Sequence, residues 1–85
     1  MGIEKIKEEL RNFIKSISRV SEKKLSKDKA GNISRQASIF ADLLDKEGFI
    51  NESEEMKVFA VAVFKNSKVT RSQIKALSDI LDELT

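Results

Sequence analysis

Five basic residues near the start of the chain are spaced four positions apart: Lys7, Arg11, Lys15, Arg19 and Lys23. On one continuous helix this spacing gives a single, slowly drifting ridge, and like charges in it repel by about 0.2–0.5 kcal/mol per pair. Nucleic acid would offset that repulsion, because each Lys or Arg that neutralises a phosphate releases condensed counterions. The ridge therefore indicates a phosphate track, although charges in this pattern are also typical of a solvated helix face.

The charge is uneven along the chain. Residues 1–46 carry 11 basic and 7 acidic side chains, or +4, whereas residues 47–85 carry 5 and 7, or −2. The excess is concentrated between residues 15 and 35. The side chains that we expect to contact phosphates there are Lys15, Arg19, Lys23, Lys24, Lys27 and Lys29.

The residue types needed for most enzyme chemistry are missing. The chain has no Cys and no His, which removes thiolate chemistry, the commonest general base and the commonest metal ligand. Carboxylates cluster at Asp42 with Asp45 and at residues 79–83, but acidic groups on exposed helix faces are usually solvated. We therefore expect no enzyme, no cofactor, no metal site and no small-molecule substrate.

Apolar spacing predicts the elements that would position these side chains. Ile3, Ile6, Leu10, Phe13 and Ile17 recur at gaps of three and four, which is the pattern of an amphipathic helix. Residues 21–31 are polar and fit either a short helix or a loop. A further helix is predicted from residue 33 to residue 47, with Asn32 or Ser34 as its N-cap and Gly48 as its stop. The last helix follows a capping box at Thr70 and Gln73.

Residues 51–65 are ambiguous, because Val58, Val61 and Phe64 are strand formers. The spacing of Asn51 and Glu54 suits a capping box and favours a helix, which would be apolar on most faces and so lie at the centre of the bundle. The alternative is a hairpin over residues 49–64. The prediction is a single all-α domain over residues 1–85, a compact bundle of four to five short helices; the alternative is an α+β winged helix.

The polar residues after Gly31 have the types that read base edges. Arg side chains fork onto guanine and Gln onto adenine, and such residues lie at the exposed amino end of a reading helix. The residues of this kind are Asn32, Ser34, Arg35, Gln36 and Ser38.

Residues 21–50 resemble helix-turn-helix and winged-helix DNA-binding regulators. The resemblance rests on Leu25 as a core anchor, on Gly31 as the turn, and on the sequence from Leu44 through Gly48 to Ile50. It implies two helices joined at Gly31, the second of which reads duplex DNA. Ser21 to Ser34 is about two residues longer than the tight form of that motif, and the acidic residues 52–55 occupy the place of a wing.

Two functions follow from these patterns. The first is a small non-enzymatic nucleic-acid-binding protein, a DNA-associated regulator that works as a dimer. The second is a helical module that binds one protein partner, as antitoxins, immunity proteins and phage adaptors do. A homodimer could form through the last helix, although internal packing explains the same residues; that seam is Ile74, Leu77, Leu81 and Leu84.

The apolar runs are short. The longest has seven residues, from Val58 to Phe64, whereas a membrane span needs about 18. The amino-terminal sequence also lacks the apolar stretch of a signal peptide. We therefore expect no membrane insertion and a cytoplasmic location.

Overall fold

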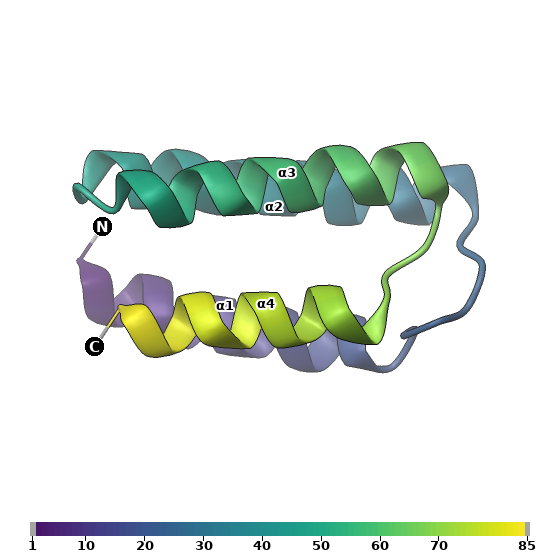
Figure 1. The fold of residues 1–85 in the computed structure, drawn as a ribbon, viewed down its shortest axis with the longest axis horizontal. Coiled ribbons are helices and arrows are strands. Elements are labelled where there is room, and N and C mark those ends of the chain that lie inside the picture. The colour runs from purple at the N-terminus through teal and green to yellow at the C-terminus, as the bar shows by residue number, and fades with distance from the viewer. Residues whose placement is uncertain (1, 85) are drawn as a thin grey trace.

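Residues 2–84 are described by a computed structural model and contain four helices: α1 (Ile3–Ser18), α2 (Lys27–Lys46), α3 (Ile50–Asn66) and α4 (Arg71–Glu83). Successive helices run in opposite directions, with α2 and α3 in one layer and α1 and α4 in the other (Figure 1). The connections 19–26 and 67–70 lie at one end of the bundle, and the turn 47–49 lies at the other (Figure 1). The predicted all-α bundle is confirmed.

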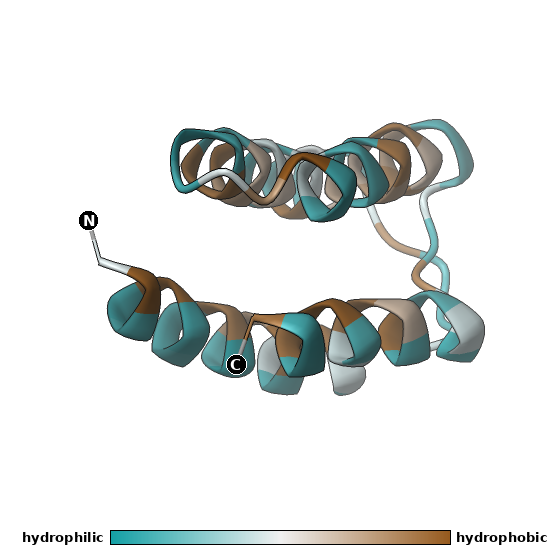
Figure 2. Cartoon of the chain, turned by 60° about the vertical axis from the view of Figure 1, so that its left-hand side comes forward, coloured by the Kyte–Doolittle hydropathy of each residue, from teal (hydrophilic) through white to brown (hydrophobic). Residues whose placement is uncertain are grey.

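The apolar stripe of α1 is buried as its spacing predicts. Ile6, Leu10, Phe13 and Ile17 all face the core, and the apolar side of the α1–α4 layer is turned toward the α2–α3 layer (Figure 2). Burial of such side chains contributes about 1.5–3 kcal/mol each. Most of the stability of this helix therefore comes from packing between the two layers.

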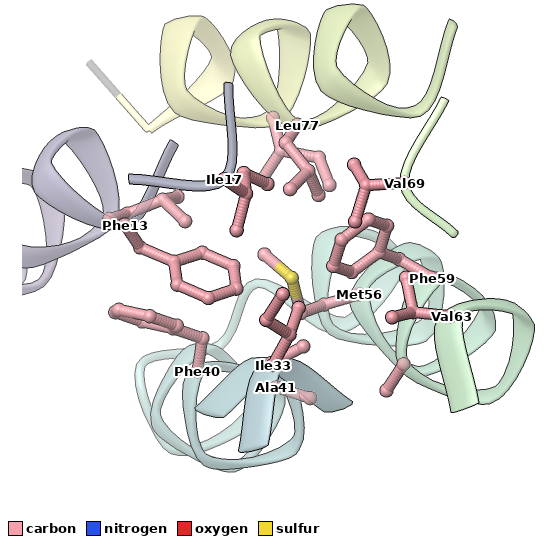
Figure 3. Close-up of a cluster of buried hydrophobic side chains, with 14 of the residues drawn as sticks. Phe13, Ile17, Ile33, Phe40, Ala41, Met56, Phe59, Val63, Val69 and Leu77 are labelled. Atoms are coloured by element: carbon pink, nitrogen blue, oxygen red, sulfur yellow. The ribbon is translucent and has the colours of Figure 1, made fainter. Parts of the chain in front are cut away.

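Aromatic side chains join the layers at the centre of the core (Figure 3). The ring of Phe13 on α1 lies 5.3 Å from that of Phe40 on α2 and 6.4 Å from that of Phe59 on α3, measured between centroids. Met56 is fully buried beside them. These contacts fix α1 across the gap between α2 and α3.

Small side chains lie where α2 and α3 meet. The Ser53 hydroxyl donates a 2.8 Å hydrogen bond to the Ala41 carbonyl, and the Ser34 hydroxyl donates one of the same length to the Ala60 carbonyl. Such bonds require a short distance between the helix backbones. The pair α2–α3 is accordingly the most closely packed pair in the described chain.

Two of the predicted helix boundaries are confirmed. The Thr70 side chain accepts from the backbone N–H of Gln73, and the Gln73 side chain accepts in return from that of Thr70, so the capping box of α4 is present. Gly48 follows α2 with a φ of +89°, in the left-handed region that glycine adopts without strain.

The predicted turn at Gly31 is wrong. Gly31 lies inside α2, which begins four residues earlier, and residues 21–26 form a turn rather than a helix. The N-cap is Ser26, whose hydroxyl accepts from the Lys29 backbone N–H at 3.2 Å, and not Asn32 or Ser34. The reason is that the apolar stripe of α2 begins at Ala30, and a helix tolerates an interior glycine at a cost of about 1 kcal/mol. Two helices joined at Gly31, as the helix-turn-helix resemblance implied, are not formed.

The prediction of a helix over residues 51–65 is confirmed and the hairpin is excluded, but two details are wrong. α3 begins at Ile50 without a side-chain cap, so Asn51 forms no capping box. The helix also does not lie at the centre of the bundle, because Val58, Val61 and Phe64 are 62–69% exposed. α3 occupies a corner of the bundle, where neighbouring helices cover only part of its circumference.

The four residues considered as a possible dimer seam on α4 pack within the bundle. Leu77 and Leu84 are buried in the core, and Ile74 and Leu81 pack against it from its edge. The seam thus packs internally, which was the alternative explanation of its spacing. Within residues 2–84, none of the helices has the length and apolar character needed to cross a membrane.

Candidate nucleic-acid interface

Basic side chains gather at the end of the bundle that carries the connections 19–26 and 67–70. The carboxyl ends of α1 and α3 and the amino ends of α2 and α4 all meet there. Residues 19–29 and 65–71 carry eight cations and two anions, Glu22 and Asp28, for a charge of +6. We call the eight cations the basic end: Arg19, Lys23, Lys24, Lys27, Lys29, Lys65, Lys68 and Arg71.

The two connections are tied together by backbone hydrogen bonds. The Glu22 N–H donates to the Val69 carbonyl and the Leu25 N–H donates to the Ser67 carbonyl, both at 2.7 Å. These bonds flank an isolated antiparallel bridge in which Lys24 faces Lys68. Leu25 and Val69 are buried beneath it. Two like-charged residues are therefore held opposite each other by the fold itself.

Glu22, one of the two anions among these residues, holds the connection 19–26 against α4. Its carboxylate accepts a 2.8 Å hydrogen bond from the Arg71 backbone N–H, at the amino end of α4, and its φ is +64°. A carboxylate at a helix amino end is favoured by the exposed N–H groups and the helix dipole. Glu22 thereby closes the connection 19–26 onto α4.

A surface groove between α1 and α2 joins the basic end. Arg19 of α1's carboxyl end lines it together with Lys29, Asn32 and Gln36 of α2, and Asp28 also borders it. The predicted contact residues Arg19, Lys29, Asn32 and Gln36 therefore do share one surface. The Arg35 guanidinium is exposed and donates a 3.0 Å hydrogen bond to Asn32 Oδ1, which places it beside this group.

The other residues predicted to read bases do not share that surface. Ser34 is half-buried, and its hydroxyl donates to the Ala60 carbonyl of α3, so it faces α3. Ser38 is exposed and lies one turn beyond Ser34 on α2. Since residues 32–38 occupy nearly two turns, their side chains point around the helix and do not form one reading face.

The basic ridge of α1 joins the basic end only at its carboxyl end. A four-residue step turns about 40° past a full helical turn, so the ridge rotates by about 120° between Lys7 and Arg19. Lys7 is 15% exposed and forms an ion pair with Glu4 at 3.6 Å. Arg11 and Lys15 are exposed between these two positions. α1 ends before Lys23, which reaches the basic end through the connection instead.

The sequence reasoning missed three members of the basic end: Lys65, Lys68 and Arg71. They are about forty residues away from the others in the chain. The signal was present in the alternation of four helices with short connections, because an antiparallel order brings every second connection to the same end.

The opposite half of the bundle is acidic. When each helix is divided at its midpoint, the half made of residues 11–36 and 58–76 carries 12 basic and 2 acidic side chains, or +10. Residues 2–10, 37–57 and 77–84 carry 4 and 12, or −8. The small net charge of +2 therefore results from two large, separated charges of opposite sign.

Acidic side chains of α3 and α4 approach one another in that half. The pKa of Glu83 is raised above its ordinary value by a side-chain hydrogen bond with Glu52, by desolvation, and by the charges of Glu52, Glu55 and Asp79. Within residues 2–84, no three carboxylates are arranged to hold a metal ion.

No family model, curated protein or solved structure matches this chain.

Proposed function

We propose that the protein binds nucleic acid, as duplex DNA, through the basic end. The observation that carries this proposal is the gathering of eight cations from four helix ends and two connections onto one end of the bundle. Side chains that come from such distant parts of the chain repel one another when folding brings them together. A polyanion offsets that repulsion and releases counterions on binding.

The geometry favours recognition of the phosphate backbone over recognition of base sequence. The predicted base-reading residues surround α2, and the exposed side chains of that helix include Asp28 and Asp42, which repel phosphates. Phosphate contacts position a protein on DNA without reading sequence. The protein therefore acts as a non-enzymatic, DNA-associated regulatory protein with little sequence preference, and Asn32 and Gln36 supply polar contacts beside the cations.

The acidic half determines the orientation of binding. Its charge of −8 is repelled by DNA, whereas the charge of +10 on the other half is attracted. The bundle is 33 Å long, and it therefore approaches the duplex with its long axis pointing at the DNA and its basic end nearest to it.

The salt dependence of DNA binding tests this function. We expect fluorescence anisotropy with a labelled duplex to give a slope of log K against log salt of about −4 to −5, which corresponds to roughly five phosphate contacts. The variant Lys23→Glu with Lys24→Glu should reduce the slope by about two, because each reversal removes a phosphate contact.

The matched control is Lys5→Glu with Lys46→Glu, which changes the net charge equally in the acidic half. The control should bind DNA nearly as well as the unmodified chain. Absent binding at low salt, or an equal loss in both variants, would contradict DNA binding through the basic end.

A groove between α3 and α4 supports a second candidate function, the binding of one protein partner. It measures about 410 Å³ and is lined by apolar side chains that include Val58, Ala62 and Ala76, and by the acidic residues Glu55 and Asp79. These features suit a basic amphipathic helix. Affinity purification should recover one stoichiometric partner with the unmodified chain and lose it with Ala76→Glu; recovery that Ala76→Glu does not change would contradict this function.

A further inference from the structure

The outer side of α3 carries an apolar seam that the bundle does not cover. Glu54, Val58, Val61 and Lys65 are exposed and succeed one another at gaps of four, three and four residues. This is the spacing of one side of a coiled-coil helix. We call these four residues the α3 seam; they also line one shallow surface groove.

Packing within a single copy of the chain does not explain why these apolar side chains are on the surface. Val58 is 69% exposed and Val61 is 62% exposed, and the neighbouring Phe64 is 68% exposed. Valine is a weaker helix former than residues without a β-branch, such as Ala or Leu. Neither valine therefore improves the local stability of α3. Large apolar side chains that adjoin one another on a surface mark interaction sites.

The order of charges along the α3 seam indicates that a second copy of this chain packs against it. The midpoint between Val58 and Val61 coincides with the midpoint between Glu54 and Lys65. If a second copy of α3 packs against the first in the antiparallel direction, Val58 therefore faces Val61 of that copy. In the same register, Glu54 faces Lys65 at both ends of the seam. A two-fold axis between Val58 and Val61 satisfies all four contacts at once.

The charge of the whole molecule favours the same arrangement. An antiparallel pair places the half with +10 beside the half with −8 of the other copy, whereas a parallel pair places like charges together. We propose that the chain forms an antiparallel homodimer through the α3 seam. The α1–α2 groove is lined by residues of α1, α2 and their connection and by none of α3, so it remains open in this dimer.

The dimer is expected to be weak, because a single helix seam buries less area than a standard interface. Sedimentation equilibrium at low salt should show the mass rise from 9.6 kDa toward twice that value, with a dissociation constant on the order of 100 µM. Val61→Glu should abolish the rise, because it buries an unpaired carboxylate at the axis.

The matched control is Ile39→Glu, which introduces the same charge at an apolar side chain of α2 that is 54% exposed. This variant should dimerise like the unmodified chain, and circular dichroism should show both variants to be folded. A chain that stays monomeric up to about 1 mM, or an equal effect of both variants, would overturn the proposal.

A charge exchange tests the antiparallel direction. Glu54→Lys alone places two lysines together at each end of the seam, and Lys65→Glu alone places two glutamates together. Each should raise the dissociation constant about three- to tenfold. The double variant Glu54→Lys with Lys65→Glu should restore dimerisation, because every pair is again of opposite sign. In a parallel dimer, like charges would face each other in the unmodified chain and in every variant, so neither single variant would weaken dimerisation relative to the unmodified chain. That result would refute the proposed direction.

Discussion

Ser53 shows how a single polar residue fits the core between α2 and α3. It is 1% exposed, and its hydroxyl is satisfied by the Ala41 carbonyl. Ser53→Ala should cost about 1 kcal/mol in the free energy of unfolding, because one intramolecular hydrogen bond is lost. Ser53→Val should cost more, about 1–3 kcal/mol, because the added methyl groups have no space where the helices approach closely.

Urea unfolding measures both effects, and Ser38→Ala on the exposed side of α2 provides the control that should change stability little. If the valine variant were as stable as the alanine variant, α2 and α3 would not be closely packed at residue 53.

Glu83 makes stability depend on pH at the acidic end of α4. Because its pKa is raised in the folded chain, chiefly by the hydrogen bond with Glu52, the folded state binds the proton more tightly than the unfolded state. The associated stability is present at pH below the ordinary value of 4.5 and is lost as the pH rises through the higher folded pKa.

Glu83→Gln should therefore raise the melting temperature at pH 7 and change it little at pH 4, where Glu83 is already protonated. Thermal unfolding followed by circular dichroism at both pH values measures this difference. Glu8→Gln on α1, which makes the same change of charge outside this cluster, is the control. A gain for Glu83→Gln that is equal at both pH values would contradict the role of the raised pKa.

At the scale of the element, Gly31 and Gly48 have opposite roles in α2 and in the turn that follows it. Gly31 is inside the helix, and a Cβ built there meets no atom within 4 Å; Gly48 has a φ of +89°. Gly31→Ala should stabilise the protein by about 0.5–1 kcal/mol because alanine is the better helix former. Gly48→Ala should destabilise it by about 1 kcal/mol because of its left-handed backbone. Chemical denaturation measures both. A destabilising Gly31→Ala would indicate a turn at that position.

The same helix shows what local sequence could and could not predict. Periodicity predicted α1, and the spacing of Thr70 and Gln73 predicted the capping box of α4. The helix over residues 51–65 was predicted from a capping box at Asn51 that α3 does not contain, so that prediction was right for the wrong reason. The boundary of α2 was not accessible, because glycine at residue 31 suggests a turn, whereas the extension of the apolar stripe to Ala30 keeps it helical. The orientation of α3 was also inaccessible. Its residues are apolar on most sides, and only the position of neighbouring helices decides which are exposed.

At the scale of the whole molecule, the sequence did not show which helix ends lie together in the bundle. The basic residues from 15 to 29 were recognisable as a cluster, but their alignment with Lys65, Lys68 and Arg71 depends on the up-and-down order of the helices. That order separates +10 from −8 along a bundle 33 Å long. The separation links both proposals, since it would orient the bundle on DNA and would favour the antiparallel direction of α3 pairing.

A charge distribution selected for binding should be unfavourable for folding, and the bridge of Lys24 with Lys68 allows this to be tested. Like charges opposite each other in such a bridge are destabilising. Lys68→Glu should therefore raise the free energy of unfolding by about 0.5 kcal/mol while it weakens DNA binding and lowers the salt slope by about one. Lys46→Glu should act in the opposite sense, with lower stability because it adds charge to the acidic half and with DNA affinity nearly unchanged. Denaturation and anisotropy on the same samples measure both quantities. If Lys68→Glu lowered stability, or left DNA affinity intact, the basic end would be a structural feature and not the binding surface.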